Sequence, residues 1–185
     1  MTRIVIFGNS GSGKSTLASE LAETRRLAHF DLDTIAWLTT TPPVWQALET
    51  SKTTLDEFVR QNAEWVIEGC YADLIELVLA EANQMIFMDL PVSACQENTR
   101  RRPWEPKKYE SKEAQNANLS MLPDWIAQYD ERDDAFSRAA HEAIFERFHG
   151  KKVIYNSNER PAHTAPRKVA LGAFESADNG TWNND

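Results

Sequence analysis

The pattern of apolar residues predicts five short strands that alternate with helices. Short, continuous apolar runs are typical of strands that are buried on both faces of a parallel sheet. These runs comprise residues 3–7, 28–30, 65–67, 85–88 and 152–155. Between the first two runs, residues 17–22 place apolar side chains on one face of a helix that should end near Arg25 or Arg26. The alternation predicts a three-layer α/β/α fold around a five-stranded parallel sheet.

Further helices are predicted from apolar spacing and from proline and glycine signals. They are expected at residues 73–82, from Pro91 to a stop at Pro103, from Pro123 onward, and at residues 133–148. Thr53 and Asp56 resemble a capping box, which predicts that another helix begins there.

The chain reads as one domain with two less regular regions. We expect one domain over residues 1–160, with a small helical insert at about 34–64 and a mobile lid at about 102–120. Lys107 and Lys108 in the lid either close over bound phosphates or are simply solvated. Residues 161–185 have weak periodicity and a polar end, so we expect a loosely ordered tail.

A glycine-rich loop directly after the first strand carries the strongest chemical signal. The loop has the pattern G-x-x-x-x-G-K-[ST] and opens into the first helix, which is the context of a phosphate-binding loop. Its residues are Gly8, Asn9, Ser10, Gly11, Ser12, Gly13, Lys14, Ser15 and Thr16. Backbone N–H groups of such a loop surround phosphate oxygens, the lysine reaches the β- and γ-phosphates, and the serine hydroxyl binds Mg²⁺. The alternative is a Gly/Ser-rich turn that precedes a helix, but the match and its flanks favour nucleotide binding.

Carboxylates follow the second and third predicted strands. Asp31 and Asp33 are two residues apart, so in an extended chain they point to the same side at the carboxyl end of a strand. There they could hold Mg²⁺, orient an acceptor hydroxyl or take its proton; a turn with two solvated acids, or a helix cap by Asp33, is the alternative. Glu68 ends the third strand, where a phosphate-loop protein places a second Mg²⁺-directed acid, unless it is a structural acid bonded to a loop.

Cationic and aromatic residues supply the remaining candidates. Arg100, Arg101 and Arg102 end a predicted helix, where they fan out, so that one or two at most could reach a phosphate. Compensation of the helix dipole is the alternative role. Trp37 and Trp45 either line an acceptor pocket or pack the insert.

Composition limits the classes of function. The chain has 185 residues, a net charge of −8 and two cysteines, and no apolar run approaches transmembrane length. The charge argues against broad nucleic-acid binding. Cys70 and Cys95 lack metal-type or redox-type spacing, and we see no secretory leader, so we expect a cytoplasmic protein with no membrane partner.

The motifs resemble those of the nucleoside-monophosphate-kinase and shikimate-kinase group of phosphate-loop kinases. More closely, they resemble small bacterial kinases described as adenylate-kinase-related or DNA-topology-modulation proteins. The matching segments are F-G-N-S-G-S-G-K-S-T, H-F-D-L-D, W-V-I-E-G, M-D-L-P and R-R-P-W-E-P-K-K-Y, within residues 3 to 160. The resemblance implies a sheet of strand order 2-3-1-4-5, an acceptor insert after the second strand and a lid after the fourth.

The resemblance also implies roles for single residues. Gly8 to Thr16 would bind ATP, Ser15 with Asp31 or Glu68 would hold Mg²⁺, and Lys14 with Arg100 or Arg101 would stabilise the transferred group. Asp33 would orient or deprotonate the acceptor.

Two departures concern the third strand and the insert. Glu68-Gly69-Cys70-Tyr71 stands where these kinases often have Asp-Gly-Asn-Tyr, and between Arg26 and Arg100 the only arginine is Arg60. An arginine is normally needed in the insert to recognise an acidic acceptor, so a neutral acceptor remains open.

The sequence therefore predicts a phosphotransferase that uses ATP and Mg²⁺ on a small-molecule acceptor, nucleotide-like or shikimate-like. A regulatory nucleotide switch with slow hydrolysis is the alternative. The sequence leaves the oligomeric state open.

Overall fold

The computed structural model describes residues 1–40, 42–104 and 110–159. The expected tail at 161–185 lies outside the described residues, and so do Lys107 and Lys108. Within the described part, five parallel strands form the central sheet, in the order β2-β5-β1-β6-β7. The strands are β1 (Arg3–Gly8), β2 (Ala28–Asp31), β5 (Trp65–Gly69), β6 (Gln84–Met88) and β7 (Lys151–Tyr155). Counting only the strands of this sheet, the order is 2-3-1-4-5, as expected from the sequence.

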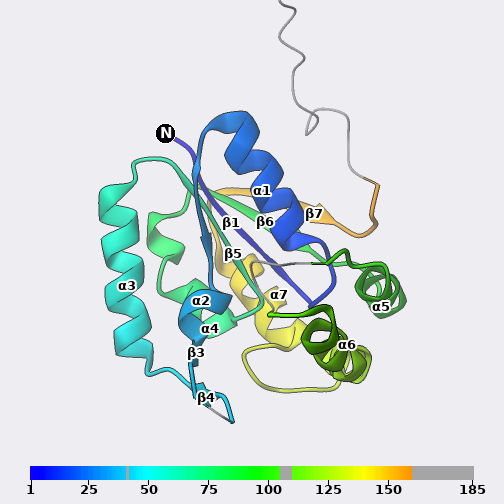
Figure 1. The fold of residues 1–185 in the computed structure, drawn as a ribbon. Coiled ribbons are helices and arrows are strands. Elements are labelled where there is room, and N and C mark those ends of the chain that lie inside the picture. Colours follow the sequence, from blue (N-terminus) through cyan, green and yellow to red (C-terminus); the bar gives the residue numbers. More distant parts are fainter. Residues whose placement is uncertain (41, 105–109, 160–185) are drawn as a thin grey trace, which may run out of the picture.

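Helices cover both faces of the sheet (Figure 1). They are α1 (Lys14–Arg25), α2 (Asp33–Ala36), α3 (Leu48–Gln61), α4 (Ala72–Glu76), α5 (Val92–Arg100), α6 (Lys112–Ala127) and α7 (Arg138–Arg147), with short 3₁₀ turns at η1 (Leu79–Glu81) and η2 (Gln128–Asp130). Figure 1 shows α3 and α4 on one side of the sheet and α1 and α5 on the other. The predicted three-layer α/β/α fold is therefore confirmed.

Alternation along β1 divides the interior into two cores. Val5 and Phe7 pack against α3, α4 and α7, whereas Ile4 and Ile6 pack against α1, α5 and α6. All four side chains are fully buried, which explains why the first strand reads as a continuous apolar run. The phosphate-binding loop thus follows the central strand of the sheet.

Several predicted boundaries were wrong. The insert contains a hairpin of β3 (Trp37–Leu38) and β4 (Val44–Trp45), which the sequence analysis did not predict. Helix α3 begins at Leu48, and Thr53 lies inside it with its hydroxyl bonded to the Glu49 carbonyl, so Thr53 is not a cap. Serine and threonine hydroxyls make such bonds within a helix, so the capping-box pattern gave a wrong start for this helix.

Three further segments differ from the predictions. The stretch 73–82 is split between α4 and η1, and α7 begins at Arg138 rather than near residue 133. Residues 112–120, predicted as part of a mobile polar lid, belong to the helix α6. That helix contains Pro123 in its interior instead of beginning there.

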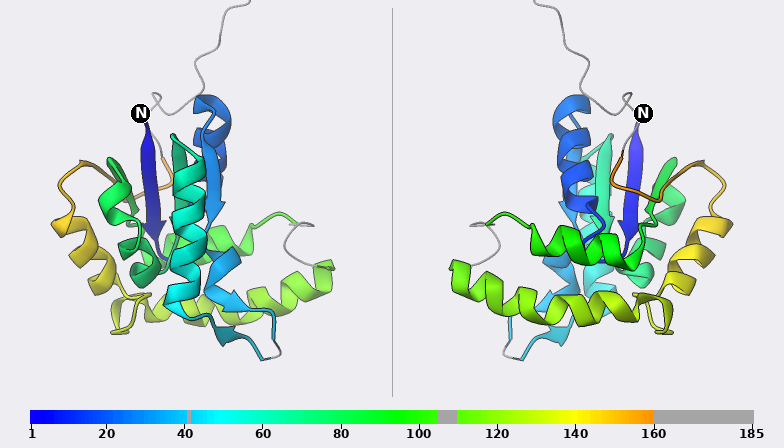
Figure 2. Two further views of the ribbon diagram at one scale, coloured as in Figure 1. Left: turned by 90° about the vertical axis from the view of Figure 1, so that its left-hand side faces the viewer. Right: turned by 90° about the vertical axis from the view of Figure 1, so that its right-hand side faces the viewer.

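Helix α6 contains a proline in its interior and packs against α5. The two helices lie side by side (Figure 2), and Gln96 Nε2 donates to the Pro123 carbonyl at 3.0 Å. Proline lacks an N–H group, so it normally interrupts the hydrogen bonds of a helix interior. Pro123 therefore does not end the helix, although a proline in this position usually does.

Leu55 anchors the insert helix α3 to the core, which gives the first prediction. Its side chain is fully buried, whereas Leu48 on the same helix is 37% exposed. We expect Leu55→Ala to lower the free energy of unfolding by about 2–5 kcal/mol, because it leaves a cavity in the core.

The matched change Leu48→Ala removes the same atoms and should cost less than about 1 kcal/mol. Urea unfolding of both variants measures the difference. Equal losses would contradict the packing described for α3.

Candidate functional site at the carboxyl ends of the strands

The phosphate-binding loop has a backbone shape that requires glycine. Gly8 and Gly11 have φ values of +143° and +76°, which side chains rarely adopt. A Cβ atom would lie 2.4 Å from the Met88 carbonyl oxygen at Gly8 and 2.3 Å from the Cys95 carbonyl oxygen at Gly11. The loop therefore lies directly against β6 and α5.

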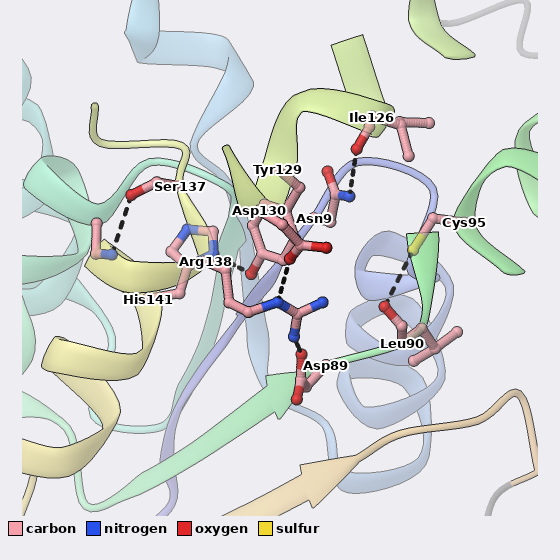
Figure 3. A network of polar contacts seen from close by, with 11 residues as sticks. Asn9, Asp89, Leu90, Cys95, Ile126, Tyr129, Asp130, Ser137, Arg138 and His141 are labelled. Carbon is pink, nitrogen blue, oxygen red and sulfur yellow. Dashed lines mark hydrogen bonds and ion pairs between the residues drawn. The ribbon is translucent and has the colours of Figure 1, made fainter. Parts of the chain in front are cut away.

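Two asparagines fasten this loop to neighbouring helices. Asn9 Nδ2 donates to the Ile126 carbonyl of α6 at 3.1 Å (Figure 3). Asn98 of α5 donates to the Gly11 carbonyl at 2.9 Å. Segments more than 80 residues apart in sequence thus fix the loop, and sequence spacing gave no signal for these contacts.

Lys14 and Ser12 bring polar groups into the loop interior. Lys14 is 8% exposed, and its ammonium group donates to the Asn9 carbonyl at 2.9 Å. The buried Ser12 hydroxyl has no hydrogen-bond partner among the described residues. A buried polar group without a partner is costly, so its presence here fits a loop that receives a further hydrogen-bonding group, such as phosphate.

A cavity of about 810 Å³ opens beside the loop. Its lining combines the loop, the acids after β2 and β5, and aromatic side chains. The lining residues are Ser10, Gly11, Lys14, Ser15, Asp31, Asp33, Thr34, Trp37, Glu68, Gly69, Cys70, Tyr71, Arg102, Met121, Leu122, Trp125 and Phe136. Half of the predicted site residues therefore line this one cavity, namely Ser10, Gly11, Lys14, Ser15, Asp31, Asp33 and Glu68.

Asp31 and Asp33 line the cavity, but not for the predicted reason. Strand β2 ends at Asp31, and Asp33 is the first residue of α2, so the two do not alternate along one strand. Instead the Asp31 carboxylate accepts a hydrogen bond from the Asp33 backbone N–H at 2.9 Å. A turn, rather than an extended chain, places both acids at the cavity.

Glu68 is the most buried acid of the site. It is 2% exposed and pairs in register with Asp31 of the neighbouring strand. Burial, and next the proximity of Asp31, raise the pKa of the Glu68 carboxyl from 4.5 to about 7, while Lys14 and the Ser15 hydroxyl act in the opposite direction. Its Oε1 atom has no hydrogen-bond partner among the described residues, and His29 Nε2 lies 4.0 Å away.

The acids and Ser15 suit a magnesium ion only in combination with other ligands. The described residues contain no group of three or more His, Cys, Asp or Glu side chains that could hold a metal by themselves. Magnesium is commonly bound through one or two protein oxygens together with phosphate oxygens and water. The Ser15 hydroxyl, Asp31 and the unpartnered oxygen of Glu68 are oxygen ligands of this kind.

The three arginines after α5 separate into two groups. Arg100 and Arg101 both pair with Glu97, and their side chains are 61% and 78% exposed. Arg102 lines the cavity, and neither of the other two does. The structure thus brings to the cavity the arginine that the sequence reasoning had not favoured.

Aromatic residues form another part of the cavity lining, called the aromatic wall below: Trp37, Tyr71, Trp125 and Phe136. Tyr71 donates from its hydroxyl to Asp33 Oδ1 at 2.7 Å and accepts from Trp37 Nε1 at 3.2 Å. Burial, followed by nearby acidic groups, raises the pKa of the Tyr71 hydroxyl, so it remains a donor. Trp45 does not line the cavity; its ring packs on Trp37, Tyr71 and Phe136.

Sequence reasoning missed much of this wall. Met121, Leu122 and Trp125 come from α6, and Phe136 from the connection to α7. Each lies far from the motifs in sequence, and an apolar residue on a helix reads as core. Tyr71 was detectable in principle, because it closely follows Glu68 at the end of β5.

A buried network that includes Tyr129 and His141, both drawn in Figure 3, supports the backbone just after Glu68. His141 is fully buried, with Nδ1 bonded to the Tyr129 hydroxyl at 2.7 Å and Nε2 to the Cys70 carbonyl at 3.1 Å. Burial lowers the pKa of His141 to about 3 and raises the pKa of the Cys70 thiol to about 12. Both groups therefore stay neutral, and their role here is structural.

Arg138 extends the same network. Its guanidinium group pairs with Asp89, which follows β6, and with Asp130 of η2 (Figure 3). The interaction joins the segment after β6 to the segment after α6.

In the part of the chain that the structure describes, every helix is too short or too polar to span a membrane.

Comparisons with solved structures give similar chains at low identity. A sugar kinase from Janibacter sp. HTCC2649 is 13% identical over 89% of this chain and 90% of that chain, with a TM-score of 0.49. A shikimate kinase from Bacteroides thetaiotaomicron is 19% identical over 85% and 88%, with a TM-score of 0.48. A shikimate kinase from Acinetobacter baumannii, in complex with shikimate, is 15% identical over 78% and 92%, with a TM-score of 0.38.

No curated protein matches the chain in sequence. The family model described as an AAA domain matches residues 4–118, which include the phosphate-binding loop, Asp31, Asp33 and Glu68. Because the match covers more than half of the chain, this protein belongs to the AAA domain family.

Proposed function

We propose that the protein is a phosphotransferase that moves the γ-phosphoryl group of ATP to a hydroxyl group of a small molecule. The observation that carries the proposal is the single cavity shared by Lys14 of the loop and Asp33 beside the aromatic wall. A donor site and an acceptor site must adjoin for direct transfer, because such catalysis rests on positioning and electrostatics. The motif resemblance to adenylate-kinase-related bacterial kinases supports the same proposal.

Lys14 and Arg102 are proposed to stabilise charge on the transferred group. Both side chains line the cavity, and Lys14 lies in the loop that suits phosphate. Arg102 takes the role that the sequence suggested for Arg100 and Arg101, since it lines the cavity and those two do not. Bound Mg²⁺ would supply further positive charge to the phosphate oxygens, held by Ser15 with Asp31 or Glu68.

Asp33 is proposed to act on the acceptor. Its carboxylate takes the proton of the acceptor hydroxyl as the acceptor oxygen bonds to the γ-phosphorus, while the bond to the bridging oxygen breaks and ADP leaves. The hydrogen bond from Tyr71 fixes the orientation of this carboxylate.

Replacement of the loop lysine tests the donor side. We expect Lys14→Met to lower turnover of ATP at least about a hundredfold, because it removes a charge at the transferred phosphates but keeps the apolar stem. Lys52→Met is the matched control, since Lys52 pairs with Asp56 on the surface of α3. Steady-state ADP release measures both, with circular dichroism to check folding; unchanged turnover in Lys14→Met would rule out this mechanism.

Replacement of the proposed base tests the acceptor side. We expect Asp33→Asn to reduce phosphoryl transfer by about 10²–10⁴-fold and to change ATP affinity by less than about threefold, because the amide cannot accept the proton. Asp56→Asn, on the exposed face of α3, is the control. Equal losses in transfer and in ATP affinity would instead indicate a metal-binding or structural role for Asp33.

Titration of Glu68 tests its proposed role at the metal. The unfolded chain ionises this group near its ordinary value of 4.5, whereas the folded protein does so near 7. In metal-free buffer the contribution of Glu68 to stability is therefore lost as the pH rises through this window. The advantage of Glu68→Gln in free energy of unfolding should grow between about pH 5 and about pH 8.

Magnesium nucleotide should reverse this difference, because a bound cation favours the ionised carboxylate. Near pH 8 we expect Mg²⁺ with an ATP analogue to raise the melting temperature of the unaltered protein more than that of Glu68→Gln. Equal stabilisation of the two proteins would remove Glu68 from the metal site.

A further inference from the structure

The charges around the cavity are poorly suited to an acidic acceptor. Lys14 and Arg102 are the basic side chains of its described lining, and the proposed function already uses both for ATP. Asp31, Asp33 and Glu68 contribute carboxyl groups to the same lining. Among the described lining residues, no further cation is left to pair with an anionic group on the acceptor, and an unpaired charge in a partly buried site is costly.

Two other arginines, Arg60 and Arg132, do not line the cavity and so do not supply a cation to an acidic acceptor. Arg60, the only arginine of the insert, lines a separate hollow with Arg3 and Glu81. Arg132 lies behind the aromatic wall, with its guanidinium carbon 3.7 Å from the centre of the Trp125 ring, and it pairs with Asp134. Its side chain is 12% exposed and does not line the cavity.

The wall itself offers flat apolar surfaces and one placed carboxylate. Trp37, Tyr71, Trp125 and Phe136 line the cavity, and the Phe136 ring packs edge-on against the rings of Tyr71 and Trp125, 5.2 Å from each. Such faces stack on planar or weakly polar rings. Asp33, oriented by Tyr71, stands at the edge of this wall to receive a hydroxyl group.

We propose that the acceptor is a ring-bearing alcohol that carries no carboxylate or phosphate group, bound between the aromatic wall and Asp33. This inference rests on the proposed phosphotransferase function and specifies its substrate class. It separates the chain from kinases whose acceptors are recognised through an anionic group.

Paired probes that differ only in charge test the inference. Calorimetry would measure the affinities of the four common ribonucleosides against their 5′-monophosphates, and of methyl shikimate against shikimate. Saturating Mg²⁺ and a non-hydrolysable ATP analogue keep the probes out of the donor site. We expect at least one uncharged probe to bind, and to bind at least about tenfold more tightly than its charged partner, because the partner leaves an unpaired anion.

Tighter or equal binding of the charged member of each pair, or no binding by any uncharged probe, would overturn the inference. Failure of the proposed function gives a different result: either the ATP analogue with Mg²⁺ does not bind, or ATP is hydrolysed at a rate that none of the probes, charged or uncharged, changes. Phosphorylation of a charged probe alone would support the phosphotransferase and overturn the inferred substrate class.

A gain-of-charge variant provides the second test. Met121 lines the cavity from α6, and its side chain is 70% exposed, so it can be replaced with little effect on packing. We expect Met121→Arg to strengthen binding of the monophosphates at least about tenfold, because it supplies the missing cation. The neutral control Met121→Gln should not; an equal response of the two variants would mean that charge at this wall does not select the acceptor.

Discussion

The close approach of the phosphate-binding loop to its neighbours is the constraint on which the rest of the site depends. The loop backbone passes so near the Met88 and Cys95 carbonyls that side chains at Gly8 and Gly11 would collide with them. Asn9 and Asn98 then bind the loop to α6 and α5. A loop held at several points keeps its N–H groups in place without a ligand, and such preorganisation is what phosphate binding and phosphoryl transfer require.

The same contacts connect the loop to the acceptor wall. Helix α6 accepts the hydrogen bond of Asn9 at Ile126 and also supplies Met121 and Trp125 to the cavity. A shift of α6 would therefore move the wall and disturb the loop together. Glu68 is placed by different means, because the network of His141 and Tyr129 holds the Cys70 carbonyl just after it. Contacts from α5, α6 and α7 thus position the site at the carboxyl ends of the strands.

Elements with a strong local signal were predictable from the sequence. The five strands of the sheet, the loop and the end of α1 near Arg25 follow from apolar runs and a specific motif, and the family resemblance implied the strand order. Asp31, Asp33 and Glu68 were found because parallel strands bring their carboxyl ends to one edge. These features depend on residues that are close in the chain or on the sheet topology alone.

The remaining features depend on tertiary contacts that no local pattern encodes. Pro123 should have ended or begun a helix, yet it lies in the interior of α6. Which of Arg100, Arg101 and Arg102 lines the cavity depends on how the chain continues after α5, which helical spacing alone could not decide. Trp125 of α6 and Phe136 of the connection to α7 read as core residues, and only tertiary packing brings them to the cavity.

Following the γ-phosphoryl group of labelled ATP tests the central claim most directly. The protein would be incubated with Mg²⁺ and a panel of nucleosides, nucleoside monophosphates and shikimate, with a control that lacks any acceptor. The account predicts label in an acceptor product, with ADP release that depends on that acceptor. Label found only in inorganic phosphate, at the same rate with and without acceptors, would contradict it and indicate a nucleotide switch with slow hydrolysis.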